Sequence, residues 1–200
     1  MYNEVQPHEL TDAEIIEVID HFVAAVQRAK KAGFDGVQLH LAHGYLFSSF
    51  LSPHMNKRKD KWGGSIHNRF RIIHEILIRC RKSVGDYPIF AKINAFEKSS
   101  DGMKTSEAIK ISMLLEKYGC NGIDVSSGIG EDGFWTTRGQ FPFEIIKKDN
   151  FRVQDIPAFL HPIVKLYLKK RMESSFPYTL YNLEIAKQIK NAEKYLSLSS

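Results

Sequence analysis

The chain has 200 residues, of which 43% are hydrophobic and 26% are charged, a composition typical of one soluble domain with a hydrophobic core. Its formal net charge is +5, but no basic run alternates with aromatic residues, so the sequence argues against nucleic-acid binding. No stretch approaches the roughly 18 uncharged apolar residues of a membrane span, and we expect a cytoplasmic protein.

The chain contains two cysteines, Cys80 and Cys120, and neither has a CxxC or another metal-ligand spacing. Cys80 falls within a helical pattern, and Cys120 directly precedes a predicted strand. We therefore predict two small core residues, with no disulfide framework and no metal site.

The first elements in chain order are a helix and a strand. Thr11 and Glu14 have the spacing of a capping box. Apolar residues follow at helical spacing to about Lys31, and Gly33 ends the helix. Residues Val37–Ala42 then have the composition of a short buried strand.

A long loop follows this strand and leads into further helices and strands. Ser65 is a suitable N-cap for the second helix. The elements predicted after it are a strand at Ile89–Ala95, a helix at Thr105–Tyr118 and a strand at Gly122–Ser126.

The pattern loosens over residues 129–178, which we predict to form a long irregular excursion. This segment holds glycine, proline and aromatic residues, with a short helical run near Ile163–Arg171. A last helix at about Leu180–Tyr195 closes the chain, and we assign residues 1–200 to a single domain.

Alternating helices and short apolar strands predict a parallel α/β sheet, either doubly wound or part of a (β/α)8 barrel. No GxGxxG follows the first strand, which disfavours a dinucleotide-binding fold. Polar residues instead gather near the carboxyl ends of the strands, and they are His40, His43, Asn94 and Ser126. Because barrel enzymes keep their chemistry at this end of their strands, the sequence favours a barrel.

The most informative stretch is HLAHGY, from His40 to Tyr45. The imidazoles of His40 and His43 can hold one oxygen atom between two N–H groups, and the phenol of Tyr45 can deliver a proton nearby. A metal site needs a third ligand, and no HExxH motif or carboxylate partner accompanies the pair. Two hydrogen-bonded structural histidines are the plain alternative. We predict a site that polarises a carbonyl group and protonates the carbon beside it.

Two runs of sequence resemble the old yellow enzyme (NADH:flavin oxidoreductase) family. The first is AGFDGVQLHLAHGYL at residues 32–46, and the second carries FLSP, WGGS and NR motifs between residues 50 and 69. The similarity extends from about Pro7 to the last helix. It implies an α/β fold that is a partial TIM (β/α)8 barrel, from the helix before the family's fourth strand to the helix after its sixth.

In that family, FMN lies across the mouth of the barrel, NADH or NADPH reduces it, and hydride passes to an activated alkene such as an enone. The resemblance implies that His40 and His43 bind the carbonyl oxygen of this small-molecule substrate. It implies that Tyr45 is the proton donor.

The resemblance also implies cofactor-binding residues. Lys92 takes a strand position where many members have an arginine beside the flavin, and a lysine within a strand needs a partner or a function. Ser126 and Gly128 are predicted to line the FMN cavity, although a tight turn explains them equally well.

The second run is characteristic of the family, but we interpret it as structural. Gly63 and Gly64 permit tight turns of the backbone. Arg58, Asp60 and Arg69 are predicted to form one ion-pair network that holds the loop.

The three predicted strands are fewer than a closed barrel needs, so we expect an incomplete barrel that is weakly active or inactive alone. The first hypothesis is an FMN-dependent oxidoreductase. The second is a non-catalytic fragment, or one piece of a split enzyme that joins a companion chain or itself through the open barrel edges. The third is an aldolase or sugar-phosphate isomerase that uses Lys92, which leaves His40, His43 and Tyr45 unexplained.

Overall fold

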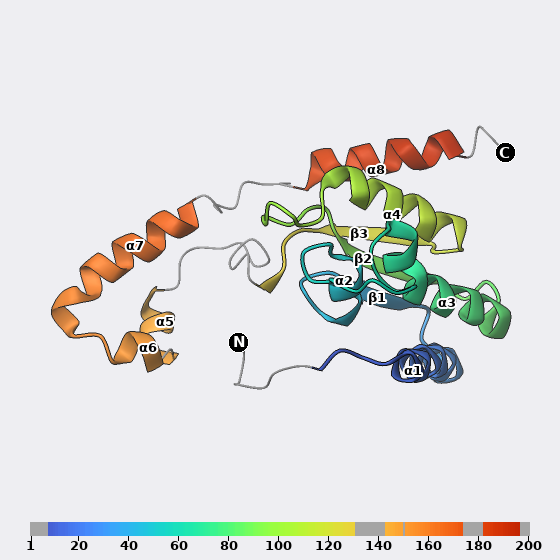
Figure 1. Cartoon of the computed structure of the whole chain (residues 1–200), viewed down its shortest axis with the longest axis horizontal. Coiled ribbons are helices and arrows are strands. Elements are labelled where there is room, and N and C mark those ends of the chain that lie inside the picture. The colour runs from blue at the N-terminus through green and yellow to red at the C-terminus, as the bar shows by residue number, and fades with distance from the viewer. Residues whose placement is uncertain (1–7, 131–142, 150, 174–181, 197–200) are drawn as a thin grey trace.

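The computed structural model describes residues 8–130, 143–149, 151–173 and 182–196 (Figure 1). Its centre is a parallel sheet in the order β1-β2-β3, formed by β1 (Val37–Leu41), β2 (Ile89–Asn94) and β3 (Gly122–Ser126). The three predicted strands are confirmed to within one residue at each end. Strands of a barrel follow one another in chain order without a reversal, and this sheet has that order.

Helices pack against one face of the sheet, and they are α1 (Asp12–Lys31), α3 (Ile66–Val84), α4 (Thr105–Lys117) and α8 (Leu183–Leu196). In Figure 1, α1 is seen nearly end-on below α3, against which it packs, and α8 lies along α4. The predicted caps are confirmed, because Thr11 and Glu14 form a capping box and Ser65 accepts from the N–H of Asn68. Across the parts of the chain that the structure describes, no helix combines the length and apolar character that crossing a membrane requires.

The core lies between these helices and one face of the sheet. Alternate strand residues on this face are at most 4% exposed, and they are Leu39, Leu41, Ile89, Ala91 and Ile93. Because side chains alternate along a strand, the residues between them share the opposite face. The opposite face is exposed or half-buried, and it carries Gln38, His40, Phe90, Lys92 and Asp124. One face therefore stabilises the fold, and the other is open to a ligand or a further chain segment.

Arg81 of α3 fixes the amino ends of β2 and β3. Its guanidinium donates to the carbonyl oxygens of Tyr87 and Gly119, which precede the two strands. It also donates to Oδ1 of Asn121, and this oxygen accepts from the N–H of Ile89 at 2.9 Å. One cation thus joins both strand entrances, at the end of the sheet away from the polar residues that follow the strands.

The predicted long loop after β1 contains a short helix, α2 (Leu46–Leu51). A helix of 6 residues is too short to show a clear apolar period in the sequence. The rest of the loop is held to the start of α1, because the buried Trp62 donates from Nε1 to Asp12 Oδ1 at 2.6 Å.

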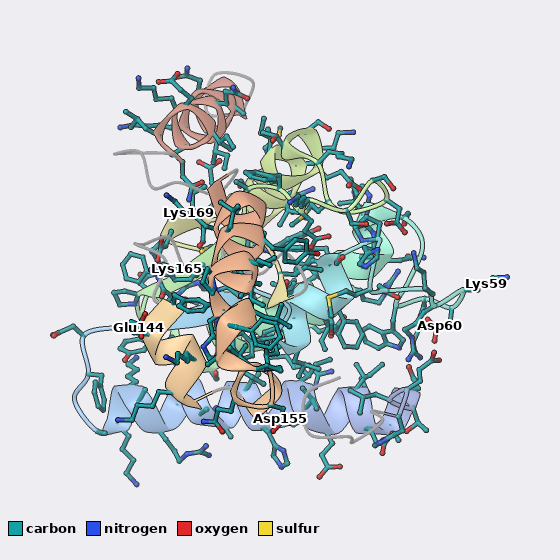
Figure 2. All side chains as sticks on the ribbon, turned by 90° about the vertical axis from the view of Figure 1, so that its left-hand side faces the viewer. Lys59, Asp60, Glu144, Asp155, Lys165 and Lys169 are labelled. Atoms are coloured by element: carbon teal, nitrogen blue, oxygen red, sulfur yellow. The ribbon has the colours of Figure 1, made fainter. Side chains whose placement is uncertain are left out.

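The predicted ion-pair network of this loop is wrong as a single network. Arg58 does pair with Asp60, at 2.5 Å. Arg69, however, is 3% exposed, donates to the carbonyl oxygen of Leu51 and pairs with Glu107 of α4. Figure 2 shows Lys59 and Asp60 at the edge of the molecule.

The predicted irregular excursion is largely helical where the structure describes it. Its elements are α5 (Phe143–Asp149), α6 (Phe151–Gln154), the 3-10 helix η2 (Ala158–Leu160) and α7 (His161–Glu173). The predicted helical run is confirmed and is longer than expected. The other helices were missed because they have only 7, 4 and 3 residues, too few to show an apolar period. Figure 1 shows this group apart from the sheet, on the side toward which β3 leads. Residues 131–142 and 174–178 of the excursion lie outside the described residues.

The two cysteines differ in environment. Cys80 is fully buried, as predicted, and burial raises the pKa of its thiol to about 11. Cys120 is half-buried, and its thiol donates to the carbonyl oxygen of Gly122 at 3.3 Å.

Two adjacent glycines in the loop give a test of its packing. A Cβ at Gly63 would lie 2.2 Å from the carbonyl oxygen of Arg58, whereas a Cβ at Gly64 would meet nothing within 4 Å, although Gly64 has φ +78°. We predict that Gly63→Ala lowers the free energy of unfolding by about 3 kcal/mol, because backbone must move. Gly64→Ala should cost about 1 kcal/mol, the cost of a left-handed alanine. Urea unfolding measures both values, and equal losses would contradict the close approach at Gly63.

Candidate functional site

The structure brings His40, His43 and Tyr45 together at the carboxyl end of β1. The His40 ring centroid lies 5.2 Å from that of His43, with the two planes at 81°. It lies 4.8 Å from the ring centroid of Tyr45. Tyr45 is also the N-cap residue of α2, and it is 62% exposed. Two imidazoles and a phenol therefore form one cluster that small molecules can reach.

The turn that carries His43 has an unusual backbone conformation. His43 has φ +64° and the following Gly44 has φ +82°, so two consecutive residues are left-handed. A left-handed conformation costs a residue with a side chain about 1 kcal/mol, and such residues often occur at functional sites.

Two buried polar side chains hold this turn. The N–H of His43 donates to Asn94 Oδ1 at 3.2 Å, and the N–H of Gly44 donates to Ser48 Oγ at 3.0 Å. Asn94 Nδ2 also donates to Ser48 Oγ, and both side chains are almost fully buried. The sequence placed Asn94 at a strand end but gave no signal for Ser48, which lies within the short helix α2.

The ring of His43 also has a fixed partner. Its Nε2 lies 2.6 Å from Oγ of Ser126, at the end of β3. Gly128 follows with φ +84°, and its N–H donates to the carbonyl oxygen of Phe96. The contacts of Ser126 thus join it to the histidine cluster, whereas those of Gly128 are those of a turn.

Lys92 lies beside His40 on the open face of the sheet, because the two are paired in the register of β1 and β2. The register of β2 and β3 pairs Lys92 in turn with Asp124. Lys92 Nζ lies 2.5 Å from Asp124 Oδ2, and Gln38 Nε2 donates to the same oxygen at 3.5 Å. The sequence analysis missed Gln38 and Asp124. Alternation would have found both, since each lies two residues before a residue already selected, His40 or Ser126.

The electrostatics of the cluster favour neutral imidazoles. The pKa of His40 is lowered by loss of hydration and then by the charge of Lys92. The pKa of His43 is lowered by loss of hydration, then by His40 and by Lys92. A neutral imidazole carries one N–H donor and one acceptor nitrogen. The site can therefore offer two neutral donors, a phenol and a cation to an oxygen that carries partial negative charge.

The loops that border this site are joined to each other. Glu97, which is 2% exposed, accepts from Ser52 Oγ at 2.6 Å and from the N–H of Met103 at 2.9 Å. Asp101 accepts from Lys57 and lies 2.7 Å from Nδ1 of His54, and these contacts hold the pKa of its carboxyl well below the usual range. Over the described ranges, no group of three or more His, Cys, Asp and Glu side chains is arranged to hold a metal ion.

The sequence matches the model of the NADH:flavin oxidoreductase / NADH oxidase family over residues 1–148. It is 47% identical over 127 residues to an NADH oxidase of Thermoanaerobacter brockii, a match that covers 63% of this chain and 20% of the relative. It is 43% identical over 122 residues to an NADPH dehydrogenase of Halalkalibacterium halodurans, covering 61% of this chain and 36% of the relative.

Among solved structures, the chain is similar to a 2-naphthoyl-CoA reductase in complex with 2-naphthoyl-CoA. The TM-score is 0.61 at 31% sequence identity, and the match covers 79% of this chain and 25% of that chain. The predicted partial (β/α)8 barrel is confirmed. The chain spans well under half the length of each of these relatives.

The lowered pKa values of His40 and His43 predict a pH dependence of stability. The unfolded chain takes up protons near the ordinary histidine pKa of about 6.5, before the folded chain does. The contribution of these two histidines to folding stability is therefore fully present above about pH 6.5. It is lost as the pH falls toward their lower pKa values in the folded chain. We expect urea midpoints to fall from pH 7.5 to pH 5.5, and to fall less in a His40→Gln, His43→Gln variant.

The control for this experiment is His67→Gln, at an exposed position of α3 outside the cluster. It should keep the full loss of stability between the two pH values. An identical loss in the double variant would show that the cluster does not cause the pH dependence.

Proposed function

Because the chain belongs to the NADH:flavin oxidoreductase / NADH oxidase family, we propose that it forms the substrate-binding part of an FMN-dependent oxidoreductase of the old yellow enzyme type. The observation that supports this function best is the cluster of His40, His43 and Tyr45 beside an ion-paired lysine. The chain spans 20% of the length of one relative and 36% of another. The oxidoreductase activity of a whole enzyme and a cytoplasmic location are therefore proposed here too.

The proposed substrate is an activated alkene such as an enone. Its carbonyl oxygen accepts hydrogen bonds from His40 and His43. Negative charge that develops on this oxygen during reduction is stabilised by donors that the turn and the strand already hold in place. Tyr45 delivers the proton to the carbon next to the carbonyl group, and its exposed phenol suits that role.

This role specifies the tautomer of His43. Its Nε2 is occupied by the Ser126 hydroxyl at 2.6 Å, so the N–H that binds the substrate is on Nδ1. The Ser126 hydroxyl then donates to Nε2. Ser126 thus orients His43, in addition to the place beside the cofactor that the sequence predicts for it and for Gly128.

Lys92 fits the cofactor-binding role predicted for it. It lies on the open face, its side chain is 30% exposed, and it can present a cation to the electron-rich edge of the FMN ring. When bound, FMN supplies the hydride that it takes from NADH or NADPH. Engagement of Lys92 Nζ by Asp124 also argues against the aldolase alternative, in which this nitrogen must attack a carbonyl group.

A piece of a split enzyme is the second candidate. Phe90, in the middle strand, is 41% exposed on a sheet face that a closed barrel would cover. A companion chain or a second copy that supplies further strands would cover this face. Light scattering of the purified chain, with and without FMN, separates self-association from the need for a different companion.

The test of the proposed function is FMN binding by the purified chain. We expect a perturbed flavin absorbance spectrum, and a further change in it when His40 and His43 are both replaced by alanine. Lys92→Met should weaken FMN binding by about tenfold or more, because a charged hydrogen bond is lost. Lys59→Met, at an exposed lysine in the structural loop, should leave binding unchanged. A wild-type chain that leaves the flavin spectrum unaltered at millimolar FMN would overturn the proposal.

A further inference from the structure

Asp124 lies on the open face of the sheet, and nothing in the proposed reaction yet uses it. Its side chain is 44% exposed, and one oxygen, Oδ2, meets both Lys92 Nζ and Gln38 Nε2. Gln38 is on β1 and Asp124 is on β3, so this contact reaches across the middle strand. A carboxylate on an open face needs no such partners for solvation, because water is available to it.

The strand register places these groups in one row. Cα pairing joins His40 with Lys92, and Lys92 with Asp124, across the three strands. Neighbouring strands are about 4.8 Å apart, so consecutive members of the row are within reach of each other. Lysine is a point charge on a flexible stem of four carbons, and without a partner it samples many positions. The ion pair with Asp124 restricts Lys92 to the row beside His40.

We propose that Asp124 is a positioning residue, which holds the Lys92 ammonium beside His40 and balances its charge at the two imidazoles. This role of Asp124 rests on the proposed function in one respect, namely that the ligand beside Lys92 is FMN. Asp124 touches neither the substrate nor the reacting atoms in this assignment. It acts through Lys92, and Gln38 helps to orient its carboxylate.

The charges around the cluster support this assignment. The ammonium of Lys92 lowers the pKa of both His40 and His43, and the carboxylate of Asp124 raises both. Among the described residues, the rings of His43 and Tyr45, in the turn after β1, also lie against His40. Removal of Asp124 would take away the negative charge that offsets the effect of Lys92 on the two imidazoles. An exposed ion pair contributes little to folding, so this effect on the site is separable from stability.

The deciding experiment is an NMR titration of the His40 and His43 ring protons in the full chain. Lys92→Met should raise the pKa of both imidazoles, and Asp124→Asn should lower both. A variant with both changes should return toward the wild-type values, and Asp124→Glu should restore them. The control is Glu144→Gln, which removes an exposed carboxylate on α5 (Figure 2) and should shift neither histidine. Urea unfolding should show that Asp124→Asn keeps the stability of the wild type.

Unchanged His40 and His43 titrations in Asp124→Asn would overturn the proposal. So would a double variant whose histidine titrations do not return toward the wild-type values, because the charge of Asp124 would then not offset that of Lys92. FMN titrations of the same variants form a second readout, in which Asp124→Asn weakens binding only when Lys92 is present. If the wild type binds no FMN, the proposed function fails, while the NMR titration still decides the role of Asp124.

Discussion

The parallel hydrogen-bond ladder that joins β1, β2 and β3 is the constraint on which the site depends. Its register makes His40, Lys92 and Asp124 neighbours, although they are far apart in sequence. A shift of one residue in either pairing would turn one member of the row into the apolar core. The core prevents such a shift, because Leu39, Leu41, Ala91 and Ile93 are buried on the opposite face. The apolar packing that stabilises the sheet therefore also determines which charges meet on its open side.

The second requirement of the site is the left-handed turn at His43 and Gly44. Glycine alone would relieve the strain at position 43, but it would also remove an imidazole. The chain keeps the histidine and satisfies the turn with a buried amide and a buried hydroxyl, from Asn94 and Ser48. Strain at one residue is thus offset by polar contacts from β2 and α2, a pattern typical of side chains held for chemistry. In the proposed function, the donors would be in place before any ligand arrives, which is the condition for effective stabilisation of charge.

Much of this arrangement could be predicted from sequence, because it depends on local patterns. The capping box at Thr11, the three strands and the grouping of His40 with Tyr45 follow from spacing and from alternation along strands. Features that depend on contacts between distant segments could not be predicted. Arg69 meets Glu107 of α4 instead of the nearby Asp60, and no local pattern indicates that choice. The pairing of Lys92 with Asp124 depends on register, and α2 is too short to have a recognisable period.

The two ends of the sheet are held by different means. At the amino end, Arg81 joins the entrances of β2 and β3 through main-chain carbonyl groups, which every residue possesses. At the carboxyl end, the contacts are made by particular side chains at His43, Asn94 and Ser126. Substitutions near Arg81 are thus tolerated as long as the backbone path is kept, while the opposite rim can diversify only in coordinated sets. New selectivity at the carboxyl rim would therefore require several substitutions made together, while the amino end keeps the strand entrances joined.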